Sequence, residues 1–468
     1  MKKTLFLNPP SFDGFDGGAG ARYQAKREVR SFWYPTWLAQ PAALVPASRL
    51  LDAPARGLGI DEVAAMAGDF ELAVLHTSTP SFRSDISVAE ALKAANPDLM
   101  IGFVGAHVAI APEESVRASE AIDFVAGSEF DFTILEIAEG RPLAEVDGIT
   151  HKTGGQTVTN QPRALLRDMD RLPFVTPVYK RDLVIEDYFI GYLKHPYLSL
   201  YTGRGCKSRC TFCLWPQTVG GHIYRTRSAA NVIEEIAQAK EMFPQVKEFF
   251  FDDDTFAEEI ARGLGRLGVT WSCNAKANVP YETLKILRDN GLRLLLVGYE
   301  SGNQQILHNI RKGLLIGVAR KFTEDCHKLG ITIHGTFVLG LPGETRATIE
   351  ETIRFATEIN PHTIQVSLAA PYPGTRLYQE AAENGWLVHS GGDMIQDDGF
   401  QISSLAYPHL TQQEIFEAVA VFYKRFYFRP RKIASITFEM LKSWEMMKRR
   451  LREGVEFMHF LNAREIGS

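Results

Sequence analysis

Three cysteines lie within eight residues in the middle of the 468-residue chain, and thiolates are strong ligands of soft metals. Cys206, Cys210 and Cys213 have the spacing Cys-x3-Cys-x2-Cys, with the aromatic Phe212 directly before the last thiol. Such ligands select iron–sulfur clusters, zinc or cuprous ions. A tetrahedral zinc site needs a fourth ligand, for which His222 is the nearby candidate. The pattern favours a four-iron cluster with one iron open to a substrate, and zinc is the alternative.

The sequence predicts that this motif lies on a loop after a strand. An apolar run at Leu198–Tyr201 leads into the cysteines, and five further runs follow, each succeeded by a helical pattern. They are Val246–Phe251, Val269–Ala275, Arg293–Val297, Ile331–Leu339 and Thr363–Leu368. Six βα units predict a (βα)6 partial TIM barrel or a closed one over residues 196–400, with active-site groups on the loops after the strands.

The third of these runs alternates polar and apolar residues, which therefore point to opposite faces of the strand. Helices cover the outer face of a barrel, so the apolar members should point outward. The polar members Ser272, Asn274, Lys276 and Asn278 are then predicted to line the interior. A lysine there needs a partner, and the alternative is that Lys276 lies beyond the rim in solvent.

The first 145 residues also alternate short apolar runs with amphipathic stretches. The runs are Thr4–Leu7, Arg49–Leu51, Leu72–His76, Met100–Val104 and Ile122–Ala126. This order predicts an α/β fold, a Rossmann-like open parallel sheet with ligands at the carboxyl ends of its strands. Residues 146–195 are predicted to form a linker with a hairpin at Gly154-Gly155, and residues 401–468 a helical C-terminal tail.

Length, composition and charge exclude several classes of protein. The chain exceeds the roughly 250–300 residues of a single core, so we expect more than one domain. An apolar content of 45%, a charged content of 23% and a net charge of −5 describe a globular protein and no general nucleic-acid binder. No apolar run is long enough to cross a bilayer, no secretory signal is recognisable, and five cysteines do not form a disulfide framework. We therefore expect a cytoplasmic protein.

The cysteine motif, placed after the first strand of a six-fold βα series, resembles that of the radical S-adenosylmethionine (SAM) superfamily. Further segments resemble the motifs of this family in the same order. They are Phe249–Phe256, Gly298–Gly302, Gly335–Thr345 and Pro371–Thr375. The resemblance implies that Cys206, Cys210 and Cys213 hold a [4Fe-4S] cluster, which cleaves SAM to a 5′-deoxyadenosyl radical that abstracts hydrogen from the substrate. The protein then orients the substrate and excludes water.

The resemblance also implies which residues contact SAM. They are Phe212, Asp253, Glu300, Ser301, Gly340 and Pro342. Glu300 and Ser301 match the carboxylate and hydroxyl that meet the ribose, and the turn at Gly340 lies near the adenine. Two structural alternatives stay open: Glu300 could form a salt bridge, and the acidic triplet around Asp253 could cap the next helix.

The N-terminal part resembles the cobalamin-binding module of one branch of the superfamily. The resemblance implies cobalamin contacts at Thr77, Ser78, Gly105, His107 and Gly127. One departure is the absence of an Asp-x-His-x-x-Gly loop that would supply a histidine to cobalt. Cobalamin would then bind base-off, or the domain would be vestigial. His107 also has a structural alternative as a loop residue bonded to a backbone carbonyl.

The opening Phe6–Gly20 and Ser31–Leu38 resemble the hopanoid-biosynthesis-associated radical SAM proteins of the J type. This resemblance implies a role in the cyclitol ether head group of bacteriohopanetetrol, by radical ring contraction of an amino-sugar precursor in a lipid glycoside. One alternative is a cobalamin-dependent methylase of an unactivated carbon. Another, of a different class, is a non-catalytic iron–sulfur or zinc binding protein.

The tail after residue 421 is dense in aromatic and basic residues. Its apolar positions are Ile433, Ile436, Met440, Leu441, Trp444, Met447 and Leu451. A helix that covers the barrel is the favoured interpretation. An interfacial helix on the inner face of an anionic membrane is the alternative. The expected partners are a small-molecule or lipid-glycoside substrate and a reductant such as flavodoxin or ferredoxin.

Overall fold

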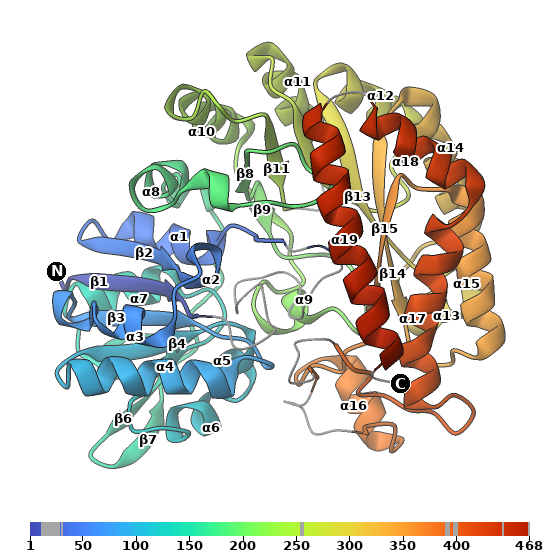
Figure 1. Ribbon diagram of the computed structural model, residues 1–468. Helices are drawn as coiled ribbons and strands as arrows, with labels where there is room; N and C mark the ends of the chain where they lie inside the picture. Colours follow the sequence, from blue (N-terminus) through green and yellow to red (C-terminus); the bar gives the residue numbers. More distant parts are fainter. Residues whose placement is uncertain are drawn as a thin grey trace.

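The computed structural model describes residues 1–10, 29, 31–252, 257–388, 394–395, 401–441 and 444–466. Five parallel strands and the helices between them form its first half. The sheet has the order β2-β1-β3-β4-β5-β6-β7. Its parallel strands are β1 (Thr4–Asn8), β2 (Ser48–Asp52), β3 (Leu72–His76), β4 (Met100–Val104) and β5 (Phe124–Ala126). These strands confirm the predicted open α/β sheet (Figure 1).

The hairpin expected in the linker extends this first sheet. Strands β6 (Ile149–Thr153) and β7 (Gln156–Thr159) pair with each other, and β6 pairs with β5, both in antiparallel fashion. Hydrogen bonds to β5 therefore make the hairpin the antiparallel edge of an otherwise parallel sheet.

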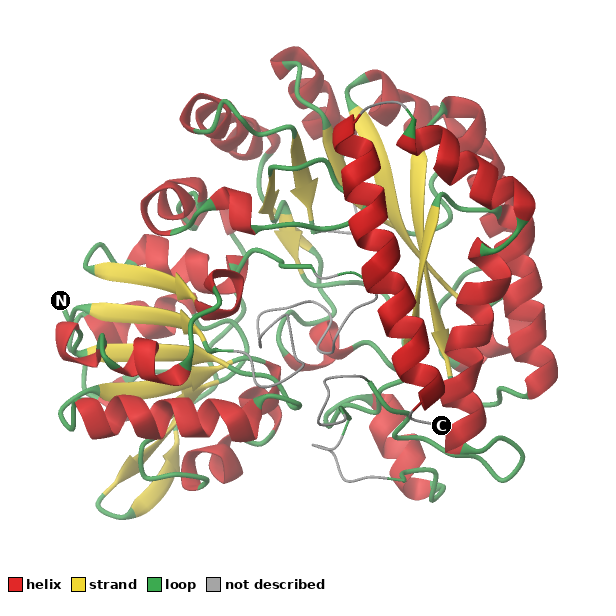
Figure 2. Ribbon diagram, in the orientation of Figure 1, coloured by secondary structure: helices red, strands yellow, loops and turns green. Residues whose placement is uncertain are grey.

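Side chains of each parallel strand alternate between two buried layers. On β1, Leu5 and Leu7 pack on one side of the sheet, whereas Phe6 packs on the other, in the core that continues into the second half of the chain. Burial on both faces explains why these strands read as unbroken apolar runs. The helices of this half are α1 (Thr36–Leu44), α2 (Ala53–Arg56), α3 (Ile60–Ala64), α4 (Phe82–Ala95), α5 (Ala106–Ile110), α6 (Pro112–Arg117) and α7 (Asp131–Ala138), with 3-10 turns at Ala67–Asp69 and Leu143–Glu145. They pack around the strands (Figure 2).

The connection between the halves is short of regular structure. It contains α8 (Thr176–Asp182) and two 3-10 turns, Met169–Arg171 and Ile185–Asp187. A small hairpin of β9 (Gly203–Arg204) and β10 (Arg225–Thr226) then follows the first barrel strand.

Six parallel strands form the second sheet, in the order β15-β14-β13-β12-β11-β8. They are β8 (Tyr197–Leu200), β11 (Glu248–Phe251), β12 (Trp271–Ala275), β13 (Leu292–Glu300), β14 (Thr332–Leu339) and β15 (Thr363–Leu368). Strands β8 and β15 are edges and do not pair, so the barrel is partial rather than closed. Its helices are α9 (Leu214–Thr218), α10 (Ala229–Met242), α11 (Glu258–Leu267), α12 (Tyr281–Asp289), α13 (Gln304–Asn309), α14 (Ile316–Leu329), α15 (Arg346–Ile359) and α16 (Arg376–Glu383).

Tyrosine hydroxyls satisfy backbone groups on both open edges of this sheet. On β8, Tyr34 donates to the carbonyl of Tyr197 at 2.7 Å, and Tyr179 donates to that of Ser199 at 3.1 Å. On β15, the hydroxyl of Tyr423 accepts the N–H of Val366 at 2.8 Å. Exposed edge groups would otherwise template pairing with another chain, so these hydroxyls stabilise the open barrel.

The C-terminal tail is helical, as predicted. Helix α17 (Gln412–Tyr427) contacts β15 and α15 and covers the barrel, and α19 (Trp444–Ile466) packs on α17. Helix α18 (Pro430–Met440) packs on α17 and α19 and is largely exposed (Figure 1). The prediction that the apolar face from Ile433 to Leu451 covers the barrel was wrong: the earlier helix α17 covers the barrel, whereas Ile433, Leu441, Trp444 and Leu451 are exposed. Within the described ranges, no helix is long and apolar enough to cross a membrane.

Candidate active site

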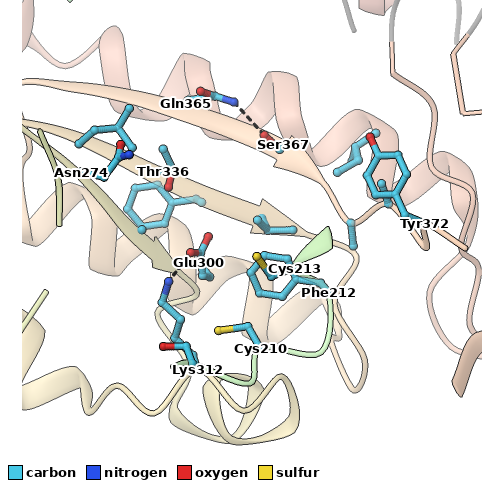
Figure 3. A pocket seen from close by; sticks show the side chains of 18 of the residues that line it. Cys210, Phe212, Cys213, Asn274, Glu300, Lys312, Thr336, Gln365, Ser367 and Tyr372 are labelled. Atoms are coloured by element: carbon cyan, nitrogen blue, oxygen red, sulfur yellow. Dashed lines mark hydrogen bonds and ion pairs between the residues drawn. The ribbon is translucent and has the colours of Figure 1, made fainter. Parts of the chain in front are cut away.

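A cavity of about 350 Å³ lies at the carboxyl ends of the barrel strands and contains all three motif cysteines in its wall. Figure 3 shows Cys210 and Cys213 facing the same space as Glu300 and Lys312. Its other polar lining residues are Ser208, Asn274, Lys276, Thr336, Gln365, Ser367, Tyr372 and Gln401. The cavity thus joins the metal-binding motif to the interior of the barrel.

A glycine and several backbone hydrogen bonds fix the cysteine loop. Gly205 has a φ of 84°, and a Cβ there would meet the carbonyl oxygen of Ile223 at 2.1 Å, so only glycine fits. The N–H of Cys206 donates to Gly221 at 3.2 Å, and the amide of Gln217 donates to the carbonyl of Cys213 at 2.6 Å. These contacts hold the thiols on a defined turn after the β9 strand.

Burial makes the free thiols weak acids. Burial, together with the negative charges of Cys210 and Cys206, raises the pKa of Cys213 to about 12. Burial also raises the pKa of Cys210, and the ammonium of Lys312 opposes that shift. Buried thiolates need a positive partner, which an iron–sulfur cluster supplies, so the three thiols fit such a group.

The zinc alternative finds less support in the geometry. Across the described ranges, no three His, Cys, Asp or Glu side chains are close enough together to hold one metal ion. The ring of His222, the candidate fourth ligand, instead forms a hydrogen bond at 3.1 Å between Nδ1 and the carbonyl of Ser208. The thiols border a common space and do not converge on one atom.

The carboxylate of Glu300 points into the cavity and is paired with a lysine. Strand β13 ends at Glu300, which has a φ of 63°, and its register to β14 shifts between Gly298 and Glu300. Oε1 of Glu300 lies 2.6 Å from Nζ of Lys312, and both side chains are largely buried. A Cβ on Gly298 would lie 2.4 Å from Glu300 Oε1 and 2.9 Å from Lys312 Nζ. Gly298 therefore leaves the room that the ion pair occupies.

Of the other residues predicted to contact SAM, some line the cavity and others do not. Phe212 lines the cavity, and its contact with SAM stays a prediction. The hydroxyl of Ser301 is instead buried at 3.1 Å from Oγ1 of Thr352, outside the cavity wall. Asp253 lies outside the described residues.

Gly340 and Pro342 are not among the residues that line the cavity. Gly340 has a φ of 84°, and its N–H donates to Oε2 of Glu344 at 2.6 Å. The carbonyl of Pro342 accepts a hydrogen bond from the amide of Asn309 at 2.9 Å. The part of this motif that reaches the cavity is earlier in the chain, at Thr336, Phe337 and Val338 on β14.

The alternating pattern of β12 places its polar members largely as predicted. Asn274 and Lys276 line the cavity, and the amide of Asn274 donates to the carbonyl of Asp252 at 2.5 Å. The hydroxyl of Ser272 donates to the carboxylate of Glu248 in the buried interior. Asn278 is exposed, because β12 ends at Ala275 and the alternation ends with it.

Several lining residues were not anticipated from the sequence. Lys312 follows helix α13, and Trp33 reaches the cavity from the N-terminal half. Gln365 and Ser367 alternate along β15, and the amide of Gln365 donates to the hydroxyl of Ser367 at 3.0 Å. The period-two argument used for β12 would have found this pair.

The predicted cobalamin contacts gather at the carboxyl edge of the first sheet, after β3, β4 and β5. Gly105 has a φ of 121°, and a Cβ there would meet the carbonyl of Thr77 at 2.2 Å. Gly127 has only Ala109 near its Cβ position, at 3.6 Å. These two glycines leave the turns free of side chains, which suits the close approach of a large flat ligand.

Hydroxyls and a histidine complete this edge. Thr77 donates to the buried carboxylate of Asp85 at 2.6 Å, and Ser78 bonds Ser81 at 2.8 Å. His107 is half-buried, which lowers its pKa, and its Nδ1 lies 3.4 Å from Oγ1 of Thr79. The imidazole is thus a neutral group at physiological pH.

The predicted cobalamin contacts lie across the domain boundary from the cysteine loop. Helix α5, which begins beside Gly105, contacts α9, which begins beside Cys213 (Figure 1). The hydroxyl of Ser128 donates to the carbonyl of Val219 at 3.3 Å. The carboxyl edges of both sheets therefore open toward a shared region.

Buried ion pairs connect the N-terminal half of the chain to the barrel half. Arg204 pairs with Asp131 at 2.6 Å, and Arg225 pairs with Glu129 at 2.8 Å. The ring of Trp37 stacks on Trp215 with centroids 5.9 Å apart. Glu129, two residues after Gly127, thus holds the barrel hairpin through Arg225 of β10.

Comparisons with known proteins show what the barrel and the whole chain are similar to. Residues 200–356 match the family model of the radical SAM superfamily. An uncharacterized methyltransferase of Pyrococcus horikoshii is 28% identical over 94% of this chain and 95% of its own length. The anaerobic magnesium-protoporphyrin IX monomethyl ester cyclase of Rubrivivax gelatinosus is 24% identical over 91% of this chain and 77% of its own.

Solved structures share the fold over most of the chain. The radical S-adenosylmethionine methyltransferase TsrM from Kitasatospora setae has a TM-score of 0.64 at 16% identity, covering 82% of this chain and 77% of its own. The cobalamin-dependent S-adenosylmethionine radical enzyme OxsB has a TM-score of 0.66 at 14% identity, covering 89% and 69%. The reported relatives match the methylase alternative better than the hopanoid expectation.

Proposed function

We propose that this chain, whose residues 200–356 match the radical SAM family model, is a cobalamin-dependent radical SAM methyltransferase that acts on an unactivated carbon of a small organic substrate. The observation that carries this proposal is the contact of α5 with α9, which brings the glycine turns of the first sheet against the cysteine loop. In this proposal residues 1–145 are the cobalamin domain, which the β6–β7 hairpin extends, and the rest of residues 146–195 is the linker. Residues 196–400 are the barrel and residues 401–468 the tail.

Each group of residues has one task in the proposal. Cys206, Cys210 and Cys213 hold the cluster, while Thr77, Ser78, Gly105, His107 and Gly127 border the cobalamin. When bound, the cluster supplies the electron that cleaves SAM, and the cobalamin carries the methyl group that is transferred.

SAM is proposed to lie in the barrel cavity beside the cysteines. The carboxylate of Glu300 accepts hydrogen bonds from the ribose of SAM, and the ring of Phe212 packs against SAM. Lys312, at 2.6 Å from Glu300, fixes the direction of that carboxylate. A fixed carboxylate binds its ligand without first losing conformational freedom.

The substrate is proposed to occupy the part of the cavity away from the thiols. Uncharged donors and acceptors line it there, at Asn274, Gln365 and Ser367, next to apolar side chains such as Phe337 and Val338. This lining suits a substrate with an apolar body and a few neutral polar groups. The same walls exclude water from the radical step. A flavodoxin or ferredoxin is the proposed reductant.

Anaerobic reconstitution with iron, sulfide and hydroxocobalamin tests the proposal. We expect one cobalamin per chain by absorbance and, with methyl-labelled SAM, a substrate-dependent yield of both S-adenosylhomocysteine and 5′-deoxyadenosine. Changing Gly105 to valine should abolish cobalamin binding while the iron content stays constant. Formation of 5′-deoxyadenosine with a ring-contracted product and no S-adenosylhomocysteine would contradict methyl transfer and support the hopanoid reaction.

A further inference from the structure

Large apolar side chains are exposed along α18, α19 and the turn between them. They are Ile433, Phe438, Leu441, Trp444, Leu451, Val455 and Met458. Phe438, Leu441 and Trp444 are 67%, 75% and 66% exposed, although residues of these types are normally buried. On α19 the exposed positions 444, 451, 455 and 458 recur at helical spacing, so they form one stripe along the helix. A contiguous apolar patch of this kind marks an interaction surface.

The opposite side of α19 is firmly packed, which fixes the direction of the stripe. Phe460 and Leu461 are buried in the main core, and the ring of Phe457 meets Tyr423 edge to face with centroids 5.5 Å apart. The guanidinium of Arg449 donates to the carbonyl of Leu193 at 2.8 Å. The stripe therefore faces outward because of tertiary contacts and not because the helix is loose.

The charge of this tail is opposite to that of the remaining chain. Residues 424–466 contain eleven Lys and Arg but five Glu, although the whole chain carries a net charge of −5. Arg431 and Lys448 are exposed, and neither forms an ion pair with a carboxylate of the described residues. The ammonium of Lys448 lies 5.4 Å from the ring centroid of Trp444, so base and aromatic share one edge of the stripe.

We propose that α18 and α19 form a docking surface for an anionic lipid bilayer. Tryptophan, phenylalanine and leucine side chains enter the boundary between head groups and acyl chains, while lysine and arginine contact the lipid phosphates. A second copy of this chain fits less well, because two positively charged tails would repel each other. Nucleic acid also fits less well, because phosphates would leave the apolar stripe in water.

Flotation of the full-length, cluster-loaded protein with vesicles tests this surface. The probes are vesicles of phosphatidylcholine alone and vesicles with 30% phosphatidylglycerol, a composition chosen for the assay. We expect binding to the anionic vesicles that falls about tenfold or more on raising the salt from 50 to 500 mM. Equal binding to both vesicles, or no binding to either, would overturn the proposal.

Two sets of variants separate the apolar from the ionic contribution to vesicle binding. F438S/L441S/W444S and R431E/K448E should each lower anionic-vesicle binding about tenfold or more without a change in the far-ultraviolet circular dichroism spectrum. The matched control is L315S/V318S, at exposed positions 57% and 41% accessible on the barrel, which should bind as the wild type does. Equal loss in the control would overturn the proposal. So would a wild-type dimer by light scattering that the tail variants convert to a monomer without any effect on vesicle binding.

Discussion

The carboxylate of Glu300 and the ammonium of Lys312 form a largely buried ion pair, 2.6 Å apart, in the wall of the cavity that the three motif cysteines share. The sequence places these two residues on either side of helix α13, and the left-handed backbone at Glu300 turns its side chain inward (Figure 3). The pair shows the salt bridge that the sequence left open for Glu300, and the contact of Glu300 with SAM stays a prediction.

Removing the charge of one partner of this pair should lower the free energy of unfolding more than removing both charges. We expect Lys312→Met to lower the free energy of unfolding of the apoprotein by about 3–5 kcal/mol, because Glu300 is left buried without its partner. The double variant E300Q/K312M should recover a large part of that loss. Urea denaturation followed by circular dichroism measures the stability of the single and the double variant. Equal stability of the single variant and the wild type would show that the ion pair contributes nothing to stability.

A methyl group at Gly298 should displace the same pair. In Gly298→Ala the new Cβ would lie 2.4 Å from Glu300 Oε1, so the carboxylate must move. We expect SAM affinity by equilibrium dialysis to fall about tenfold or more, which is the effect of losing a charge-assisted hydrogen bond of about 1.5–3 kcal/mol. Gly317→Ala, where nothing lies within 4 Å of the added atom, is the control and should bind SAM normally. Unchanged affinity in both variants would exclude Glu300 as a SAM contact.

The ion pairs between the halves should stabilise their arrangement. Glu129 and Arg225 are nearly inaccessible to solvent and lie 2.8 Å apart, so Glu129→Gln should cost about 3–5 kcal/mol in the free energy of unfolding. The exposed pair of Glu113 and Arg117 provides the comparison, and Glu113→Gln should cost about 0–1 kcal/mol. Chemical denaturation with the two variants side by side checks this difference. Equal losses in the free energy of unfolding for the two variants would mean that water reaches the ion pair between the two halves.

Stability should fall as pH rises, because of a buried carboxyl group. Burial raises the pKa of Glu344 to about 8, although the N–H groups of Gly340 and Leu341 oppose that shift. Since the folded state binds this proton more tightly than the unfolded chain, the contribution is fully present below about pH 4.3 and is lost as pH rises through 8. We expect a slope of about 1.4 kcal/mol per pH unit in this window.

Glu344→Gln isolates that contribution. The amide keeps an oxygen for the two N–H donors but does not titrate, so the melting temperature of the variant should vary less between pH 5 and pH 8.5. Asp85, whose pKa burial raises to about 7, gives a residual slope of the same sign in both proteins. Identical pH profiles for wild type and variant would show that Glu344 is ionised when folded.

The sequence predicted elements well where burial alone decides them. Strands β3 and β4 were predicted to the residue, because both faces are covered and the chain reads as an unbroken apolar run. Strand β13 was predicted to end at Val297, but it continues to Glu300 through a register shift that apolar patterning does not encode.

The candidate site was predictable where one motif contains all its parts. The three cysteines and Phe212 lie together because the loop that bears them is short. Lys312 was missed because it meets Glu300 only after the chain has passed through α13. Ser301, in contrast, follows Glu300 directly, and its backbone turns its hydroxyl to Thr352 and away from the cavity.

Electron paramagnetic resonance of the anaerobically reconstituted protein, coupled to product analysis, tests the central claim most directly. For the wild type we predict four irons and four sulfides per chain, a signal of a reduced [4Fe-4S] cluster that changes on addition of SAM, and 5′-deoxyadenosine in the reduced sample. The variant C206A/C210A/C213A should lose all three while it keeps its circular dichroism spectrum. Zinc in place of iron, or an intact cluster that leaves SAM uncleaved after reduction, would contradict the account.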